Sequence, residues 1–257
     1  MSNNRFMKSS NPFIGDQQFV KTANKGVDLG VSRAEGVMTV QGTVNKTLIL
    51  SVILIASAFF SATFIPFSRA IFLISMFGAA GVAIVTYMKP TIAHITAPIY
   101  AVLEGVAMGT VTYMLAFLYA GDPGIITNAI LLTALTLVSM LGAYKFGLIK
   151  PTKKFRSIIT TATGAIMMMY LISIGLSFFG VNIPYLHTAG PIGIGISLFI
   201  IGIAALNLIL DFDNIERGAQ MGAPKMMEWV SGMGLLITIV WIYFEILKLL
   251  AILSGRE

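Results

Sequence analysis

The chain has 257 residues, of which 56% are hydrophobic and only 11% are charged. A soluble domain carries about 25% charged residues, so this chain lacks the charge needed to cover a surface that faces water. The composition therefore predicts a membrane protein and excludes a disordered one, because disordered segments are poor in apolar residues. The absence of cysteine also excludes a disulfide scaffold, thiolate catalysis, iron–sulfur clusters and thiolate zinc sites.

Residues 1–46 form a polar segment that contains six of the seventeen Lys and Arg residues and no long apolar run. A signal peptide would have an apolar core close behind its basic start, so we expect a basic tail without a fold of its own. Within it, Met38–Lys46 is placed to lead directly into the first helix. Residues 47–257 are expected to form one transmembrane domain.

Seven apolar runs follow the tail, separated by short breaks that contain Pro or Gly. About 20 apolar residues cross the hydrocarbon core of a bilayer, and each run is that long, whereas strands of a membrane barrel are alternating segments of about 10 residues. The sequence therefore predicts an all-α integral membrane protein, a bundle of seven transmembrane helices. The expected spans are Leu48–Phe67, Ala70–Met88, Ala97–Tyr119, Gly124–Ala143, Ile158–Phe179, Ile192–Asp211 and Trp229–Leu253.

The net charge of +6 is explained by membrane orientation. If the N-terminus lies inside, fourteen Lys and Arg residues fall on the cytoplasmic side of the seven spans and three fall outside. Because basic residues collect on cytoplasmic loops, we expect a cytoplasmic N-terminus and a C-terminus outside. No nucleic-acid recognition motif accompanies the basic residues, so we expect no nucleic acid as a partner.

Four acidic side chains lie within or at the ends of the predicted spans, namely Glu104, Asp211, Asp213 and Glu245. A charged side chain at the centre of a membrane helix costs about 2.5–3.5 kcal/mol, so each is a candidate functional residue. Glu104 precedes a small-residue face formed by Gly105 and Gly109, which lets another helix approach closely. Its carboxyl is either a proton or cation ligand that faces the bundle interior or a hydrogen-bonded group that joins two helices.

Asp211 and Asp213 end the predicted sixth span, and residues two apart on a helix point in nearly opposite directions. Asp211 lies one turn after Asn207, with which it would form a polar stripe, so Asp211 is the better candidate for an interior site. Asp213 is placed to pair with Arg217 at i,i+4, which is typical of a solvated helix end.

Glu245 is followed three residues later by Lys248, and an ion pair between them is one explanation for a carboxylate in the seventh span. Lys248 also lies close enough to the outer boundary to extend its side chain toward water, which would leave Glu245 for an interior role. Two carboxyl groups at one buried site share their protonation, which makes the pair sensitive to pH. Because a permanent Ca²⁺ site needs six to eight oxygens, such a pair favours permeation over storage.

Other chemistry is absent from the sequence. His94 and His187 fall on opposite sides of the predicted membrane, so they do not form one metal site, and there is no His-Glu-x-x-His motif. The Gly-x-Gly-Asp element of an intramembrane aspartyl protease is also missing. We therefore expect no catalytic residue, no cofactor, no permanent metal site and no enzymatic activity.

Four stretches resemble the Bax inhibitor-1 family (the transmembrane Bax inhibitor motif family) and, within it, the bacterial YccA-like branch. They are Met-Thr-Val-Gln-Gly-Thr-Val-Asn-Lys-Thr at 38–47, Leu-Asp-Phe-Asp-Asn-Ile at 210–215, Gly-Ala-Pro-Lys-Met-Met-Glu-Trp at 222–229 and Trp-Ile-Tyr-Phe-Glu-Ile-Leu-Lys-Leu-Leu at 241–250. The resemblance covers nearly the whole chain from Met38. It implies a bacterial plasma (inner) membrane location and a bundle whose last helix is surrounded by the others.

The resemblance also implies a pH-sensitive calcium leak gated by acidic residues of the sixth and seventh helices. By motif position, Asp211 matches the sixth-helix aspartate, Glu245 matches the seventh-helix acid, and Lys89 takes the place of a basic latch residue. Other relatives are associated with cell-death suppression or with regulation of membrane-protein proteolysis. The alternative function is therefore a non-transporting regulator that binds membrane proteins or a membrane protease complex.

Two departures from the family pattern qualify the mechanism. The second span carries no acidic residue, whereas Glu104 appears on the third. A turn at Gly222-Ala223-Pro224 would also place Glu245 deeper in the membrane than Asp211, so either the two carboxyls act indirectly or Asp211 pairs with Glu104. With these alternatives open, we expect a cation leak whose partners are the lipid bilayer, H⁺ and Ca²⁺, with Ca²⁺ held only transiently at Asp211 and Glu245.

Overall fold

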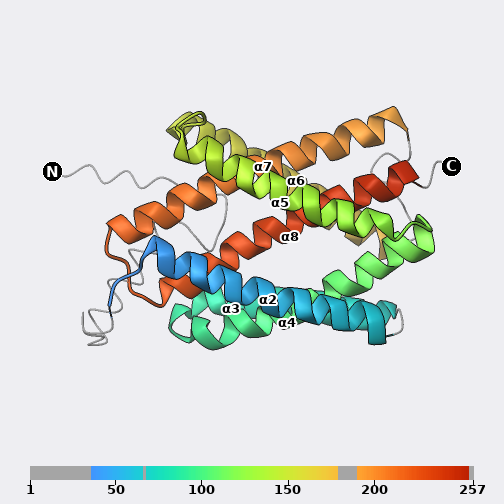
Figure 1. Ribbon diagram of the computed structural model, residues 1–257, viewed down its shortest axis with the longest axis horizontal. Helices are drawn as coiled ribbons and strands as arrows, with labels where there is room; N and C mark the ends of the chain where they lie inside the picture. The colour runs from blue at the N-terminus through green and yellow to red at the C-terminus, as the bar shows by residue number, and fades with distance from the viewer. Residues whose placement is uncertain (1–35, 66–67, 179–189, 255–257) are drawn as a thin grey trace. The chain divides into compact units, whose positions relative to one another are not determined.

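The computed structural model describes residues 36–65, 68–178 and 190–254 (Figure 1). Seven helices in these ranges are long and apolar enough to cross a membrane, and the only β pairing in them is an isolated bridge between Val37 and Pro224. The predicted all-helical class and the seven spans are thus confirmed. Most of the expected tail, residues 1–35, and His187 lie outside the described residues.

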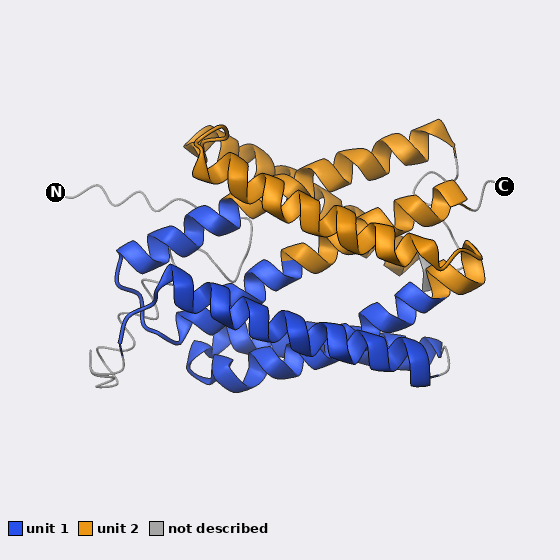
Figure 2. Ribbon diagram, in the orientation of Figure 1, with its two compact units in different colours: residues 1–113, 210–237 blue, residues 114–209, 238–257 orange. Residues whose placement is uncertain are grey.

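The chain divides into two compact units (Figure 2). Unit 1 comprises Met1–Tyr113 and Leu210–Ile237, and unit 2 comprises Met114–Ile209 and Thr238–Glu257. The last two helices are α7 (Pro191–Gln220) and α8 (Met227–Ser254), and each is divided between the two units. Among the seven spans, α8 has the largest share of buried side chains.

Unit 1 is built on three helices of the N-terminal half that lie side by side in Figure 1, with α4 packed against both α2 and α3. The three are α2 (Val40–Phe64), α3 (Arg69–Met88) and α4 (Ala93–Tyr113), and a short 3₁₀ turn, η2 (Pro90–Ile92), joins the last two. Helix α2 begins at Val40 rather than at the predicted Leu48, because Thr39 caps it: the Thr39 hydroxyl accepts a hydrogen bond from Gly42 N at 2.9 Å.

Close packing of α2 on α4 depends on two glycines of α4. A Cβ atom on Gly105 would lie 2.5 Å from the carbonyl oxygen of Leu54 and 2.7 Å from Cβ of Ser57. A Cβ atom on Gly109 would overlap the backbone of Ala58. The predicted small-residue face at Gly105 and Gly109 is therefore confirmed, and α2 is the helix that approaches it.

Hydroxyl groups add an interhelical contact to this packing. Ser61 of α2 donates a hydrogen bond at 3.1 Å to the carbonyl oxygen of Val106 in α4, and its Oγ lies 3.3 Å from Oγ1 of Thr110. Between α3 and α4, Thr86 Oγ1 donates to Thr96 Oγ1 at 2.7 Å. Polar side chains of unit 1 thus hold neighbouring helices together in a region that lipid surrounds.

Unit 2 contains the π-helical segment η3 (Met114–Tyr119), α5 (Gly124–Lys145) and α6 (Lys153–Phe178), together with its parts of α7 and α8. Many large apolar side chains of α5 and α6 are exposed, as expected for helices that face lipid. A second predicted boundary is wrong: the sixth span does not end at Asp211, because α7 continues as a helix through Gln220. The turn into α8 contains Gly222 with φ +67°, a conformation that glycine adopts without strain.

Candidate functional site

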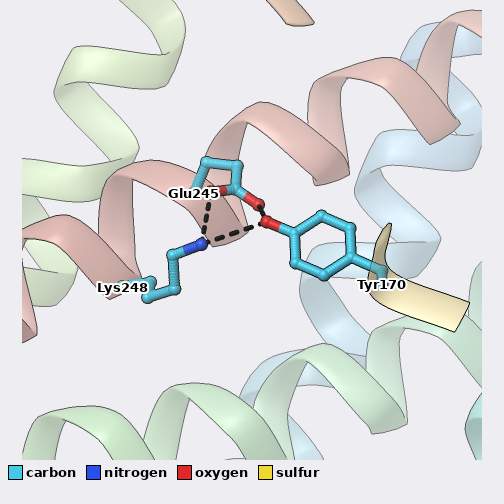
Figure 3. Close-up of polar contacts among 3 residues, drawn as sticks. All are labelled: Tyr170, Glu245 and Lys248. Atoms are coloured by element: carbon cyan, nitrogen blue, oxygen red, sulfur yellow. Dashed lines mark hydrogen bonds and ion pairs between the residues drawn. The ribbon is translucent and has the colours of Figure 1, made fainter. Parts of the chain in front are cut away.

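The predicted carboxylate of the seventh span, Glu245, forms a three-residue polar cluster with Tyr170 of α6 and Lys248 of α8 (Figure 3). The Tyr170 hydroxyl donates a hydrogen bond to Glu245 Oε1. Lys248 Nζ lies 2.6 Å from Glu245 Oε2 and donates to the Tyr170 hydroxyl at 3.1 Å. All three residues belong to unit 2.

This cluster decides between the two arrangements that the sequence left open for Glu245. Lys248 does not extend away from the carboxylate, because its side chain is only 17% exposed and pairs with Glu245. The ammonium group also lies 5.5 Å from the centre of the Tyr170 ring, within range of a cation–π interaction. Since Glu245 itself is buried, the ion pair compensates the cost of placing its charge away from water.

Tyr170 was not predicted as a site residue. It lies 75 residues before Glu245 in the chain, and a single tyrosine in an apolar helix carries no spacing pattern that would identify it. The only signal available was chemical, because a phenol hydroxyl in a membrane helix needs a hydrogen-bond partner.

Asp211 and Asn207 lie in the middle of α7 and not at its end. Asp211 is 0% exposed. The Asn207 side-chain amide donates to Thr163 Oγ1 of α6 at 2.8 Å and to the carbonyl oxygen of Ile203 at 2.9 Å. Asn207 and Asp211, the polar residues expected on one face of α7, are therefore buried. Thr163 of α6 is a hydrogen-bond partner of Asn207 that the sequence did not indicate.

Asp213 forms the predicted i,i+4 ion pair with Arg217, with 2.9 Å between Asp213 Oδ2 and Arg217 Nε. The expectation of a solvated helix end does not describe Asp213, whose side chain is only 12% exposed, against 30% for Arg217. The neighbouring Asn214 is fully buried. The polar end of α7 is thus packed within the protein as far as Ile215 and becomes exposed at Glu216.

Glu104 is half-buried in α4. A side-chain hydrogen bond joins it to Tyr100, one helical turn earlier. Glu104 thus resembles Glu245 in having a tyrosine hydroxyl as a partner, although its tyrosine comes from the same helix. Glu104 and Asp211 belong to unit 1, and Glu245 belongs to unit 2. The pairing of any two of these three carboxyls stays a prediction.

Another buried carboxylate, Glu228, was not predicted as a site residue. Glu228 lies in the first turn of α8, where the partial positive charge of a helix N-terminus favours an acid. Its Oε1 accepts hydrogen bonds from the Thr39 backbone N–H at 3.1 Å and from the Thr39 hydroxyl at 3.0 Å. The carboxylate lies so close to α2 that a Cβ atom on Gly42 would overlap it.

Other contacts join the same two segments of unit 1, 37–47 and 222–232. The Met38 N–H donates to the Ala223 carbonyl oxygen at 2.7 Å, and Lys46 Nζ lies 4.6 Å from the centre of a Trp229 ring. Two of the four stretches on which the sequence resemblance rests are therefore packed against each other. We call this set of contacts, centred on Thr39, Gly42 and Glu228, the α2–α8 junction.

Lys89, the predicted latch residue, is the C-cap of α3 and is exposed. No ion pair of Lys89 is found within residues 36–65, 68–178 and 190–254, so its latch role stays a prediction. In the same part of the chain, no group of three or more His, Asp or Glu side chains is arranged to hold a metal ion.

Seven apolar helices with carboxylates buried among them define an integral membrane protein that keeps ionisable groups inside its helical core. The model of the Bax inhibitor 1 like family matches residues 4–255. Because this match covers almost the whole chain, the protein belongs to that family. No curated protein and no solved structure matches the chain.

Proposed function

We propose that the protein is a pH-sensitive cation leak, with Ca²⁺ as the expected ion, in which intramembrane carboxyl groups control opening. The observation that carries this proposal is the complete burial of Asp211 in the middle of α7. An acidic side chain inside a membrane helix costs about 2.5–3.5 kcal/mol on insertion scales. Ion pathways and proton relays are among the functions that intramembrane acidic residues mark, which supports a conducting role for Asp211.

In the proposed mechanism, protonation of the interior carboxyls changes their pairing and shifts an equilibrium between a closed and an open state. The ionised carboxylates attract the cation. Asp211 and Glu245 are the principal residues, and Glu104, Asp213 and Lys89 contribute to the pathway or its gate. The direction of the pH response follows from which state holds the proton more tightly.

Membrane placement is part of the proposal. We propose a bacterial inner membrane protein with a cytoplasmic N-terminus and an external C-terminus, since this orientation puts fourteen Lys and Arg residues inside and three outside. We also propose that the protein is not an enzyme. Cleavage of a membrane substrate that requires Asp211 would contradict this part of the proposal.

The test is Ca²⁺ flux into liposomes that contain only this protein, measured at neutral and mildly acidic pH. Wild-type protein should show flux that changes with pH, and Asp211→Asn should abolish the pH response. Glu216→Gln is a matched control, because Glu216 is an acidic residue of the same helix but is exposed. It should leave flux and pH response unchanged.

Two results would overturn the proposal. An unchanged pH response in Asp211→Asn would remove Asp211 from the gate. Absence of flux at either pH from folded wild-type protein would favour the alternative, a non-transporting regulator that binds other membrane proteins or a protease complex. That alternative predicts a specific partner that co-purifies with the protein from its native membrane.

A further inference from the structure

The ammonium group of Lys248 is a positive charge held within unit 2 by oxygens of two helices. It contacts two oxygens from different helices, Glu245 Oε2 at 2.6 Å and the Tyr170 hydroxyl at 3.1 Å, and it lies against the face of the Tyr170 ring. In Figure 3 the three side chains point toward one another, and dashed lines join the lysine nitrogen to both the Glu245 carboxylate and the Tyr170 hydroxyl, which also contact each other. Carboxylate and phenol oxygens are hard ligands of the kind that Ca²⁺ binds.

We propose that Glu245 and Tyr170 form a cation site that Lys248 keeps closed as a tethered counter-ion. Hard cations such as Ca²⁺ enter this site only when the lysine side chain withdraws. This inference rests on the proposed leak and deepens it, because it assigns a binding position to the cation and an intrinsic competitor to that position.

Distances within the cluster support the exchange. Ca²⁺ binds oxygens at about 2.3–2.6 Å, and the lysine nitrogen already lies 2.6 Å from one carboxylate oxygen. A cation at the same point would therefore meet Glu245 with little movement of the helices. The cluster supplies the two carboxylate oxygens and one phenol oxygen, fewer than the six to eight that a permanent Ca²⁺ site needs, so an entering ion keeps much of its water and binds weakly.

Charge balance explains why lysine and cation exclude each other. Glu245 carries one negative charge, and Lys248 neutralises it. A divalent cation added beside the lysine would meet a like charge within a few ångströms, which is strongly unfavourable in a medium of low dielectric constant. Removal of the lysine charge is therefore expected to strengthen cation binding, whereas removal of the glutamate charge is expected to abolish it.

Lys248 has a position to which it can withdraw. Its side chain is 17% exposed, and it lies in the last two turns of α8, which ends at Ser254. A lysine close to a helix end can extend its four-carbon chain toward the aqueous boundary while its methylene groups remain in apolar surroundings. Two lysine positions, paired and extended, thus correspond to a closed and an open cation site.

The first test uses Tb³⁺ as an oxygen-seeking probe of purified protein at neutral pH, because Tb³⁺ bound near a tyrosine luminesces when the ring is excited. Lys248→Met should lower the Tb³⁺ concentration needed for half-maximal luminescence by about tenfold or more, which corresponds to about 1.4 kcal/mol. Adding Glu245→Gln to Lys248→Met should remove the gain. Lys145→Met, which deletes an exposed lysine, should bind Tb³⁺ as the wild type does.

The second test uses the unmutated chain and does not depend on the folding of Lys248→Met. Ca²⁺ should displace Lys248 from Glu245, so that acylation of Lys248 by a water-soluble amine reagent, read by peptide mass spectrometry, rises severalfold as Ca²⁺ is added. In Glu245→Gln, acylation of Lys248 should be high with or without Ca²⁺. Acylation of Lys145 should stay constant throughout.

The experiments distinguish the cation site at Glu245 and Tyr170 from the proposed leak. If Lys248→Met binds Tb³⁺ no better than wild type, or if Ca²⁺ leaves acylation of Lys248 unchanged, the tethered-lysine site is overturned even where liposomes show flux. If both tests succeed while liposomes show no flux, the cation site stands and the leak does not.

Discussion

The α2–α8 junction makes a prediction in which a normally favourable substitution becomes harmful. Alanine is a better helix former than glycine by up to about 1 kcal/mol, so Gly→Ala in an open helical position stabilises a protein. At Gly42 the new methyl group would overlap the Glu228 carboxylate. That side chain is flexible enough to swing away, but it would then lose both hydrogen bonds to Thr39.

The change in the free energy of unfolding follows from two opposing effects, the loss of hydrogen bonds and the gain in helix propensity. A hydrogen bond to a charged group contributes about 1.5–3 kcal/mol, so loss of both bonds costs about 3–6 kcal/mol. The gain in helix propensity offsets about 1 kcal/mol of this. We therefore expect Gly42→Ala to reduce the free energy of unfolding by about 2–5 kcal/mol.

Thermal unfolding in detergent, followed by loss of helical circular dichroism, measures this effect. Gly81→Ala is the matched control, because Gly81 lies within α3 and a Cβ atom there would meet nothing within 4 Å. Gly81→Ala should raise the unfolding midpoint slightly, and Gly42→Ala should lower it. In a Glu228→Ala background the obstacle is gone, so Gly42→Ala should become neutral or stabilising. An increase in midpoint for Gly42→Ala in otherwise wild-type protein would refute the reasoning.

Three further predictions concern packing and orientation. Ser61→Ala removes an interhelical hydrogen bond and should lower the free energy of unfolding by about 0.6 kcal/mol, the average for such bonds in membranes; a change below measurement error would show that the bond contributes nothing. Gly109→Leu should prevent α2 from packing on α4, because even a methyl group there overlaps the Ala58 backbone, and monodisperse folded protein from this variant would contradict the packing. The chain has no cysteine, so the variants Asp122→Cys and Lys225→Cys each introduce a single thiol that tests orientation. A membrane-impermeant thiol reagent added outside intact cells should label Asp122→Cys and not Lys225→Cys. The reverse labelling pattern would invert the proposed topology.

The spans were predictable because hydropathy is a local property of the chain. Helix α3, predicted as Ala70–Met88 and observed as Arg69–Met88, begins one residue early. Boundaries that depend on other interactions were missed. Helix α2 begins at Val40, directly after its capping residue Thr39, and not at Leu48, where the predicted span starts; α7 continues past Asp211 with the polar residues Asp213 and Asn214 buried.

The same distinction between local and distant contacts applies to the polar sites. The Asp213–Arg217 pair was predicted, and the Glu245–Lys248 pair was one of two alternatives considered, because side chains three or four residues apart meet on a helix. The hydrogen bond between Thr39 and Glu228 joins residues 189 positions apart, and no periodicity in the sequence encodes that contact. Only the tertiary fold brings such residues together.

Side chains at the α2–α8 junction are constrained more tightly than side chains that face lipid. A helix position that faces lipid requires only an apolar side chain, so exposed residues of α5 such as Leu131, Leu135 and Val138 are interchangeable with other apolar residues. At the junction, by contrast, Gly42 is required for space and Glu228 for its hydrogen bonds to Thr39. Exchange of Leu135 for isoleucine should therefore leave the unfolding midpoint unchanged, whereas Gly42→Ala adds a single methyl group and should lower it.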